Sequence, residues 1–190
     1  MPSAITPAAA KMRLIEVIRR RSYGTGVEIK LASGRTSNFY FNMKPTMMDP
    51  EGAHLLALLV VEALRGQKVD MVGGLEIGAV PLAAAVAAVS HAENYPLPAF
   101  FIRKQPKDHG TKSLVEGLPK GHTLAGKRVV ILEDVTTTGG SALKAIEVAK
   151  AEGAEVLGVI TLVDRDEGAS DTFKAAGIPF QAILTVHDFQ

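Results

Sequence analysis

Two adjacent acidic residues followed by a hydroxyl- and glycine-rich turn form the part of this chain best suited to chemistry. Glu133 and Asp134 come directly after the apolar run Val129–Leu132, and Thr136–Ser141 has the sequence Thr-Thr-Thr-Gly-Gly-Ser. A strand that feeds such a turn and then a helix directs backbone N–H groups and the helix dipole to one place, which suits a phosphate. Two carboxylates would repel that phosphate unless they bind donors elsewhere on the same ligand. The segment therefore predicts a ligand with a phosphate and a free ribose diol.

Two other kinds of phosphate-binding loop do not match this segment. A Walker A loop ends in Gly-Lys-Ser/Thr, and no lysine stands between Thr136 and Ser141. A dinucleotide fingerprint has the pattern G-x-G-x-x-G, with its acidic residue about 20 positions downstream rather than directly upstream. The simpler alternative is an ordinary strand–turn–helix with Thr and Ser as caps, but the threonines and glycines exceed what capping requires.

The same residues resemble the phosphoribosyl-diphosphate motif of the type I phosphoribosyltransferases, in which two acids precede a Thr/Gly loop. The resemblance implies that the acids hold the ribose 2- and 3-hydroxyls and that the loop holds the 5-phosphate. It also implies an α/β fold, a mainly parallel sheet flanked by helices, with a small N-terminal hood made of approximately residues 1–45 plus the C-terminal part. The implied ligands of phosphoribosyl diphosphate here are Glu133, Asp134, Val135, Thr136, Thr137, Thr138, Gly139, Gly140 and Ser141.

A basic run opens the long polar segment 104–127. The ten residues Arg103–Lys112 hold four Lys and Arg residues and one histidine. Loops this long in a compact domain are usually functional or disordered. A cluster of cations that closes over a pyrophosphate leaving group would stabilise the transition state, and Gly110 and Gly117 would allow the closure. The alternative is a solvated charged loop.

The order R-K-x-x-K-x-H-G-T, followed by Val115-Glu116-Gly117, resembles more narrowly the catalytic loop of the orotate phosphoribosyltransferases. In that subfamily the loop contacts the diphosphate, partly across a dimer interface. The histidine would donate a hydrogen bond or a proton to the departing group. The resemblance assigns the diphosphate to Arg103, Lys104, Lys107 and His109, and assigns catalysis to Lys104, Lys107 and His109 together with Asp134.

Three further segments resemble the base-binding end of the same subfamily. Ser33-Gly34-Arg35 and Ser37–Phe41 match its hood, which covers the pyrimidine, although Phe39 and Phe41 could equally be core residues on one strand face. Arg165 aligns with the arginine that pairs with the orotate carboxylate, the alternative being a surface arginine paired with a neighbouring acid (Asp164 or Asp166). The implied orotate ligands are Thr137, Arg165, Phe39 and Tyr40.

The chain also departs from the subfamily pattern at two places. Many members carry a lysine before the Ser-Gly pair, where this chain has Ala32, and often Tyr-Lys after the second parallel strand, where it has Glu76-Ile77. Two phosphate contacts of the family are therefore in question, with Lys30 and Lys44 as the nearby cations.

The elements that must position these residues alternate between strands and helices, which favours a mainly parallel sheet covered on both faces. Ligands of such sheets bind at the carboxyl ends of the strands, where Gly73–Gly78, Arg103 and Glu133–Ser141 all fall. We expect helices over Pro7–Arg21, Pro50–Leu64 (capped by Asp49), Val80–Val89, Ala142–Ala151 and Ser170–Ala176, and strands over Val27–Leu31, Phe39–Asn42, Met71–Gly74, Ala99–Arg103, Val129–Leu132, Val156–Val163 and Phe180–Val186.

Composition limits the class of protein. The 190 residues suit one domain, 1–190, and with 47% apolar but 5% aromatic residues they suit helices on a sheet. The net charge of +1 does not indicate a nucleic-acid partner, and the absence of cysteine excludes disulfides and thiolate chemistry. Ile77–Val89, the longest apolar run, is too short to span a membrane. The N-terminus lacks a secretory signal and indicates an amphipathic helix, or alternatively a transit peptide. We expect the protein to be located in the cytoplasm.

The resemblance as a whole implies an orotate phosphoribosyltransferase reaction. Orotate N1 would bond to the anomeric carbon of 5-phosphoribosyl 1-diphosphate, giving orotidine 5-phosphate and diphosphate, in a homodimer with shared sites. Mg²⁺ would be held mainly by substrate oxygens, so no metal ligand is assigned in the chain. The alternatives are a transferase for another base and a regulatory ribose-phosphate-binding protein without turnover.

Overall fold

Within the part of the chain that the structure describes, six strands form one central sheet. The computed structural model describes residues 5–30, 36–106 and 113–190, with the side chains of residues 25–38 outside that description. The strand order is β5-β4-β3-β6-β7-β8, and all neighbours are parallel except β4 and β5. The strands are β3 (Met71–Leu75), β4 (Ala99–Ile102), β5 (Val115–Glu116), β6 (Arg128–Thr136), β7 (Glu155–Asp164) and β8 (Phe180–Thr185). The predicted mainly parallel α/β sheet is confirmed.

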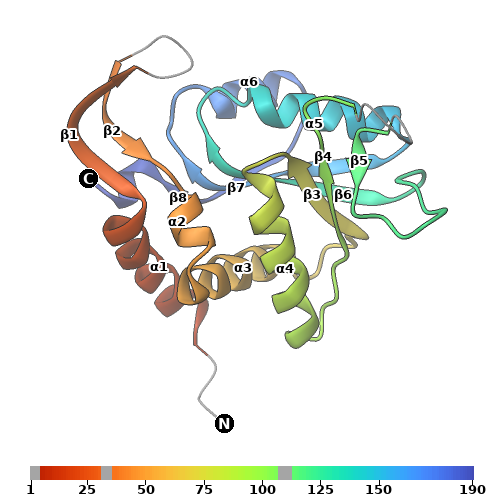
Figure 1. Ribbon diagram of the computed structural model, residues 1–190, viewed down its shortest axis with the longest axis horizontal. Helices are drawn as coiled ribbons and strands as arrows, with labels where there is room; N and C mark the ends of the chain where they lie inside the picture. Colours follow the sequence, from red (N-terminus) through yellow and green to blue (C-terminus); the bar gives the residue numbers. More distant parts are fainter. Residues whose placement is uncertain (1–4, 31–35, 107–112) are drawn as a thin grey trace.

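Helices cover both faces of the sheet, as Figure 1 shows. Successive residues of a strand point to opposite faces. Val130 and Leu132 therefore pack with the first core cluster, on the side of α1, α3 and α4, whereas Val129 and Ile131 pack with the second, under α5 and α6. The helices are α1 (Pro7–Arg21), α2 (Lys44–Met47), α3 (Pro50–Leu64), α4 (Ala79–Ala92), α5 (Gly140–Ala151) and α6 (Ala169–Ala175). Among the described residues, no helix combines the length and apolar character needed to cross a bilayer.

The strand that carries the acidic pair is longer than its apolar run. The prediction that it ends at Leu132 is wrong, because β6 continues to Thr136. Glu133 pairs with Thr161 of β7, and Thr136 pairs with Asp164. Backbone pairing with a neighbouring strand thus extends β6 through two residues whose polarity suggests a strand end.

A two-stranded hairpin stands apart from the main sheet at one end of the molecule (Figure 1). It consists of β1 (Tyr23–Lys30) and β2 (Thr36–Phe41), so its first strand begins earlier than predicted. Tyr23 and Phe41 pack on Phe189 near the C-terminus, with ring centroids 5.5 and 5.0 Å from it. We propose that the hairpin and the C-terminal end together form the hood.

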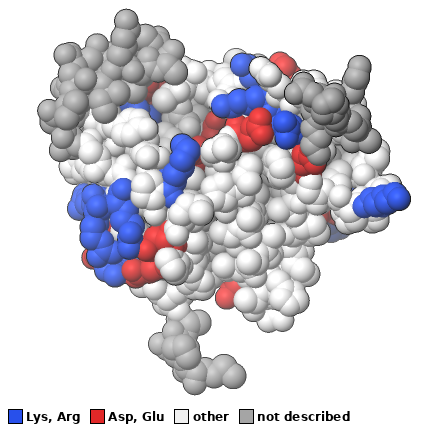
Figure 2. All heavy atoms as spheres, in the orientation of Figure 1, with Lys and Arg blue, Asp and Glu red and all other residues white. Residues whose placement is uncertain are grey.

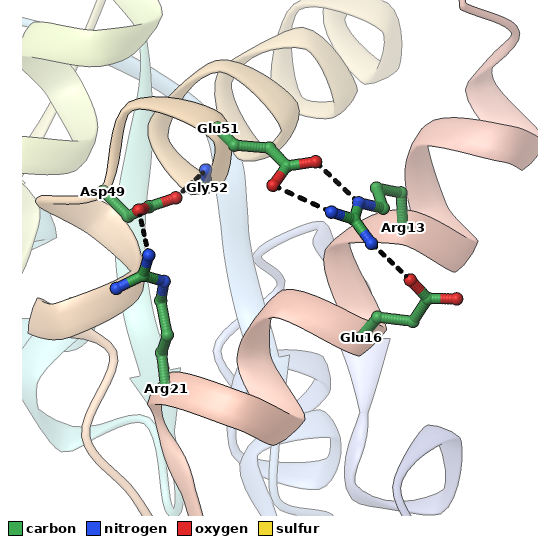
Figure 3. A network of polar contacts seen from close by, with 6 residues as sticks. All are labelled: Arg13, Glu16, Arg21, Asp49, Glu51 and Gly52. Atoms are coloured by element: carbon green, nitrogen blue, oxygen red, sulfur yellow. Dashed lines mark hydrogen bonds and ion pairs between the residues drawn. The ribbon is translucent and has the colours of Figure 1, made fainter.

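Ion pairs tie α1 to the start of α3 (Figure 3). The Arg13 guanidinium binds both oxygens of Glu51, at 2.6 and 3.1 Å, and Arg21 pairs with Asp49. Asp49 also caps α3, because its carboxylate accepts the N–H of Gly52 at 2.9 Å. Figure 2 shows a mixed patch of basic and acidic side chains at the lower left, where α1 lies in Figure 1. The helix that precedes the hairpin is thus fixed to a helix that covers the sheet.

Candidate active site

A pocket of about 380 Å³ opens at the carboxyl ends of the central strands. It lies between the loop after β3, the end of β6 and the start of α5, and Lys44 and Lys104 reach it from two other elements. Figure 2 shows acidic and basic side chains next to one another at the upper right, on this side of the molecule. This is the edge at which doubly wound sheets bind ligands.

Glu133 faces the pocket as a half-buried acid. The pKa of Glu133 is raised to about 7, mainly by burial and also by the neighbouring charge of Asp134. The hydroxyl of Thr136, which donates to Glu133 Oε2 at 2.7 Å, works in the opposite direction. At neutral pH this carboxyl group is poised between its charged and neutral forms, and a ligand that brings hydroxyl donors would favour the charged form.

Asp134 lies beside Glu133 but has different partners. Burial raises the pKa of Asp134, while hydrogen bonding from the Val135 N–H and the charges of Lys44 and Lys104 lower it. The loop after β3 approaches the carboxylate so closely that a Cβ at Gly78 would collide with it. The absence of a side chain at Gly78 therefore lets the loop after β3 approach the end of β6.

The predicted phosphate loop is a turn that opens directly into α5. Gly139 has a φ of +86°, and a Cβ there would also press on the Phe173 ring of α6, so glycine suits this position for two reasons. The first N–H groups of α5 follow at Gly140 and Ser141, which are exposed and have no partner within the helix. Thr138 is exposed beside them and Thr137 is half-buried. The turn thus presents donors to an anion.

Thr136 lies elsewhere than the rest of that loop. It is buried, with 1% of its surface exposed, and is the last residue of β6. Its hydroxyl binds Glu133, and its carbonyl accepts the N–H of Arg165 at 3.0 Å. The structure therefore gives the Thr136 side chain a part in holding Glu133 rather than in presenting donors at the turn.

Arg165 is buried just after β7. Only 5% of its surface is exposed, which overturns the alternative of a surface arginine. Its Nε lies 2.8 Å from Glu167 Oε1, and its guanidinium lies over the Phe39 ring, 4.7 Å from the centroid. Tyr40 is exposed and, as the next residue of the strand, points to the opposite face. Of the two predicted aromatic contacts, the structure brings Phe39 to Arg165 but not Tyr40.

The basic segment leaves the sheet at the end of β4. The backbone N–H of Arg103 donates to the Leu114 carbonyl at 2.9 Å, so the two ends of the segment lie side by side. Lys104 lines the pocket, whereas Arg103 donates to the carbonyl of Gln105 at 3.2 Å. Lys107 and His109 lie outside the described residues.

Several residues of the site carried little or no sequence signal. Lys44 begins α2, a four-residue helix that is too short to be predicted from periodicity. The sequence indicated Lys44 only as a cation near the predicted site. Glu76 lines the pocket at a position marked only by its departure from the family pattern. Glu167, two residues after Arg165, is the partner of that arginine and had no distinguishing pattern.

Comparisons with known proteins agree with this geometry. The sequence model of the phosphoribosyl transferase domain matches residues 50–178. The chain is 60% identical over 185 residues to the orotate phosphoribosyltransferase of Bradyrhizobium diazoefficiens, covering 97% of this chain and 98% of that one. The orotate phosphoribosyltransferase of Mycobacterium tuberculosis, solved in complex with 5-phospho-alpha-D-ribosyl 1-diphosphate, has a TM-score of 0.77 and 33% identity over 95% of this chain and 98% of that chain.

The corresponding enzyme of Aeropyrum pernix, with a TM-score of 0.75 and 32% identity, covers 93% of this chain and 95% of its own. Both the fold and nearly the full length of the sequence are therefore shared. The chain belongs to the phosphoribosyl transferase family and, within it, to the orotate phosphoribosyltransferases.

Proposed function

We propose that the pocket between β3, β6 and α5 transfers a ribosyl phosphate group from 5-phosphoribosyl 1-diphosphate to orotate. The observation that carries this proposal is the acidic pair, Glu133 and Asp134, placed between the open N-terminus of α5 and the two lysines Lys44 and Lys104. A ligand with a phosphate, a diol and a diphosphate matches these three kinds of group. The reaction would serve pyrimidine nucleotide synthesis in the cytoplasm.

Each part of the pocket would bind one part of the donor substrate. The 5-phosphate would lie at the turn Thr137–Ser141, where backbone N–H groups and the helix dipole favour an anion. The ribose hydroxyls would donate to the carboxylates of Glu133 and Asp134. The diphosphate would extend toward Lys104, whose ammonium is on the same side of the pocket as Asp134.

The reaction needs no covalent bond to the protein. The bond between the anomeric carbon and the diphosphate oxygen breaks, the bond to orotate N1 forms, and the N1 proton leaves. Positive charge develops on the ribose ring, so the nearby carboxylates stabilise it electrostatically while cations stabilise the departing diphosphate. Positioning of the two substrates supplies much of the remaining rate enhancement.

Orotate would bind toward the hood, where Arg165 and Phe39 meet. A guanidinium can pair with a carboxylate through two parallel hydrogen bonds, and Glu167 already fixes the Nε side of Arg165. The Phe39 ring, which now contacts the guanidinium, offers a face for the pyrimidine. Thr137 remains the proposed contact at the edge of the base, whereas Tyr40 points to the face of the hairpin opposite Phe39.

Mg²⁺ is the proposed cofactor. Within the described ranges no three His, Cys, Asp or Glu side chains converge as a metal cage. The two carboxylates do fit a hydrated Mg²⁺, which keeps several waters and binds through one or two carboxylates and substrate phosphates. Held mainly by diphosphate and ribose oxygens, the ion would neutralise diphosphate charge. A chelator should abolish turnover, and added Mg²⁺ should restore it.

The proposed assembly is a homodimer in which the basic segment of each subunit completes the neighbouring pocket. Its support is the order of Arg103, Lys104, Lys107 and His109 in the sequence, which resembles the shared catalytic loop of the subfamily. Lys104 itself lines the pocket of its own chain, so the residues proposed to reach the neighbouring pocket are Lys107 and His109. Isologous dimers of this kind hold two equivalent sites.

A turnover assay tests the proposed function directly. Orotate, phosphoribosyl diphosphate, Mg²⁺ and the purified chain should yield orotidine 5-phosphate and diphosphate, and uracil or adenine should replace orotate poorly. Turnover of another base in preference to orotate would contradict the assignment of the base. Binding of phosphoribosyl diphosphate without product from any base would instead indicate a regulatory protein.

A further inference from the structure

The carboxylate of Glu76 joins the loop after β3 to the start of the basic segment. Its Oε1 accepts a hydrogen bond from the backbone N–H of Lys104 at 2.8 Å. The backbone N–H of Glu76 donates to the carbonyl of Ile102 at 2.7 Å, which extends the parallel pairing of β3 with β4 beyond Leu75. One backbone and one side-chain hydrogen bond thus connect the two loops where the chain leaves β4.

These bonds determine where the backbone of Lys104 lies. The preceding residue is held from the other side, since the Arg103 N–H donates to the Leu114 carbonyl at 2.9 Å. The Lys104 side chain lines the pocket, and its charge acts on Asp134. Because a lysine ammonium sits on a flexible four-carbon stem, the backbone position decides which volume it reaches.

The half-buried Glu76 is an unexpected side chain beside a site for anionic substrates. It lines the same pocket as Glu133 and Asp134. A carboxylate there would repel diphosphate, so its presence calls for a compensating role. Accepting a backbone N–H is such a role, and charge-assisted hydrogen bonds of this kind are about twice as strong as neutral ones.

We propose that Glu76 is a positioning residue of the transferase, which holds the backbone at Lys104 so that its ammonium faces Asp134 and the departing diphosphate. The inference rests on the proposed function. It predicts that the acceptor oxygen of residue 76 matters more than its charge, since the oxygen holds the backbone N–H.

Five variants, one of them a control, separate this role from a general structural one. Glu76→Ala should lower kcat/KM for phosphoribosyl diphosphate about tenfold, as expected for the loss of one charge-assisted hydrogen bond, with the orotate KM and the Tm nearly unchanged. Glu76→Gln keeps an acceptor oxygen and should regain most of the activity. If Glu76 acts through Lys104, the double variant Glu76→Ala/Lys104→Ala should be no worse than Lys104→Ala within about twofold. The matched control is Glu62→Ala, which removes an exposed glutamate of α3 that is paired with Arg65.

A second readout does not depend on turnover. The amide proton of Lys104 should shift upfield in the NMR spectrum of Glu76→Ala and return toward its wild-type position in Glu76→Gln. An unmoved amide signal, equal losses in the Gln and Ala variants, or multiplied losses in the double variant would each overturn the positioning role. Absence of orotate turnover by the wild type would instead refute the proposed function, while the amide shift would still report whether Glu76 holds Lys104.

Discussion

The carboxylates of Glu133 and Asp134 share one pocket but are held by different partners. Thr136 binds Glu133, whereas the Val135 N–H, Lys44 and Lys104 act on Asp134. Since burial is the largest influence on both, each carboxyl group has a raised pKa in the free protein. Adjacent acids that look equivalent in the sequence therefore differ in the partners that influence their ionisation.

The pKa of about 7 at Glu133 makes binding of phosphoribosyl diphosphate depend on pH. The ribose hydroxyls need an ionised acceptor, so affinity should rise as pH increases toward and through 7. Below that pH it should fall by up to about tenfold per pH unit. Titration calorimetry between pH 5.5 and 8.5 measures this dependence. Glu133→Gln provides the correction for ionisation of the substrate itself, and an identical pH profile in that variant would contradict the prediction.

The buried Arg165 should determine affinity for orotate through the shape of its guanidinium. Arg165→Lys keeps a positive charge beside Glu167 but loses the planar fork. We expect the orotate KM to rise roughly 10- to 100-fold, equivalent to about 1.4–2.7 kcal/mol, with little change for phosphoribosyl diphosphate. Steady-state kinetics with each substrate varied would show this, and an equal rise in both constants would indicate a general structural role.

At the scale of elements, local signals predicted helix ends well. The prediction of a helix over Pro50–Leu64 with Asp49 as its cap is confirmed, because an acceptor side chain before a proline is a strong local start signal. The sequence did not predict the extension of β6 through Glu133 and Asp134. That extension depends on backbone pairing with β7, and acidic residues are depleted in strands. The four residues of α2 are too few for periodicity to reveal.

The cap of α3 also holds α1, so its loss should be measurable in the stability of the whole domain. Asp49→Ala removes the hydrogen bond to the Gly52 N–H and the ion pair with Arg21. The expected loss of unfolding free energy is about 1–2 kcal/mol, most of it from the cap. Asp49→Asn should retain most of the stability because an amide oxygen still caps the helix. Urea unfolding of the three proteins measures this, and equal losses in both variants would assign the effect to the charge.

At the scale of the molecule, the sheet collects residues from distant parts of the sequence at one edge. Glu76 and Lys104 follow two different strands and Glu133 lies near the end of a third, and the parallel arrangement of those strands could be predicted from their alternation with helices. The packing of Phe189 on the hairpin could not, because a single aromatic residue near the end of a chain does not specify its partner.

The proposed shared-site dimer predicts that two inactive variants restore each other. Lys107→Ala and Asp134→Ala homodimers should each be nearly inactive, because every site carries one defect. In an equal mixture that has exchanged subunits, half the dimers are mixed, and each of those holds one site with both defects and one with none. Activity should therefore return to roughly a quarter of wild type. Exchange without recovery would show that Lys107 serves its own subunit.

The burial that raises the pKa of Glu133 also links folding to protons. Between pH 4.5, the ordinary value, and about 7, the folded chain keeps a proton that the unfolded chain has lost. The unfolding free energy should therefore fall with rising pH, by about 3 kcal/mol in total from this group. Urea unfolding should show Glu133→Gln to be as stable as wild type at pH 4 and more stable at pH 8. The free protein is therefore less stable at the pH at which Glu133 is ionised and can accept hydrogen bonds from a ribose.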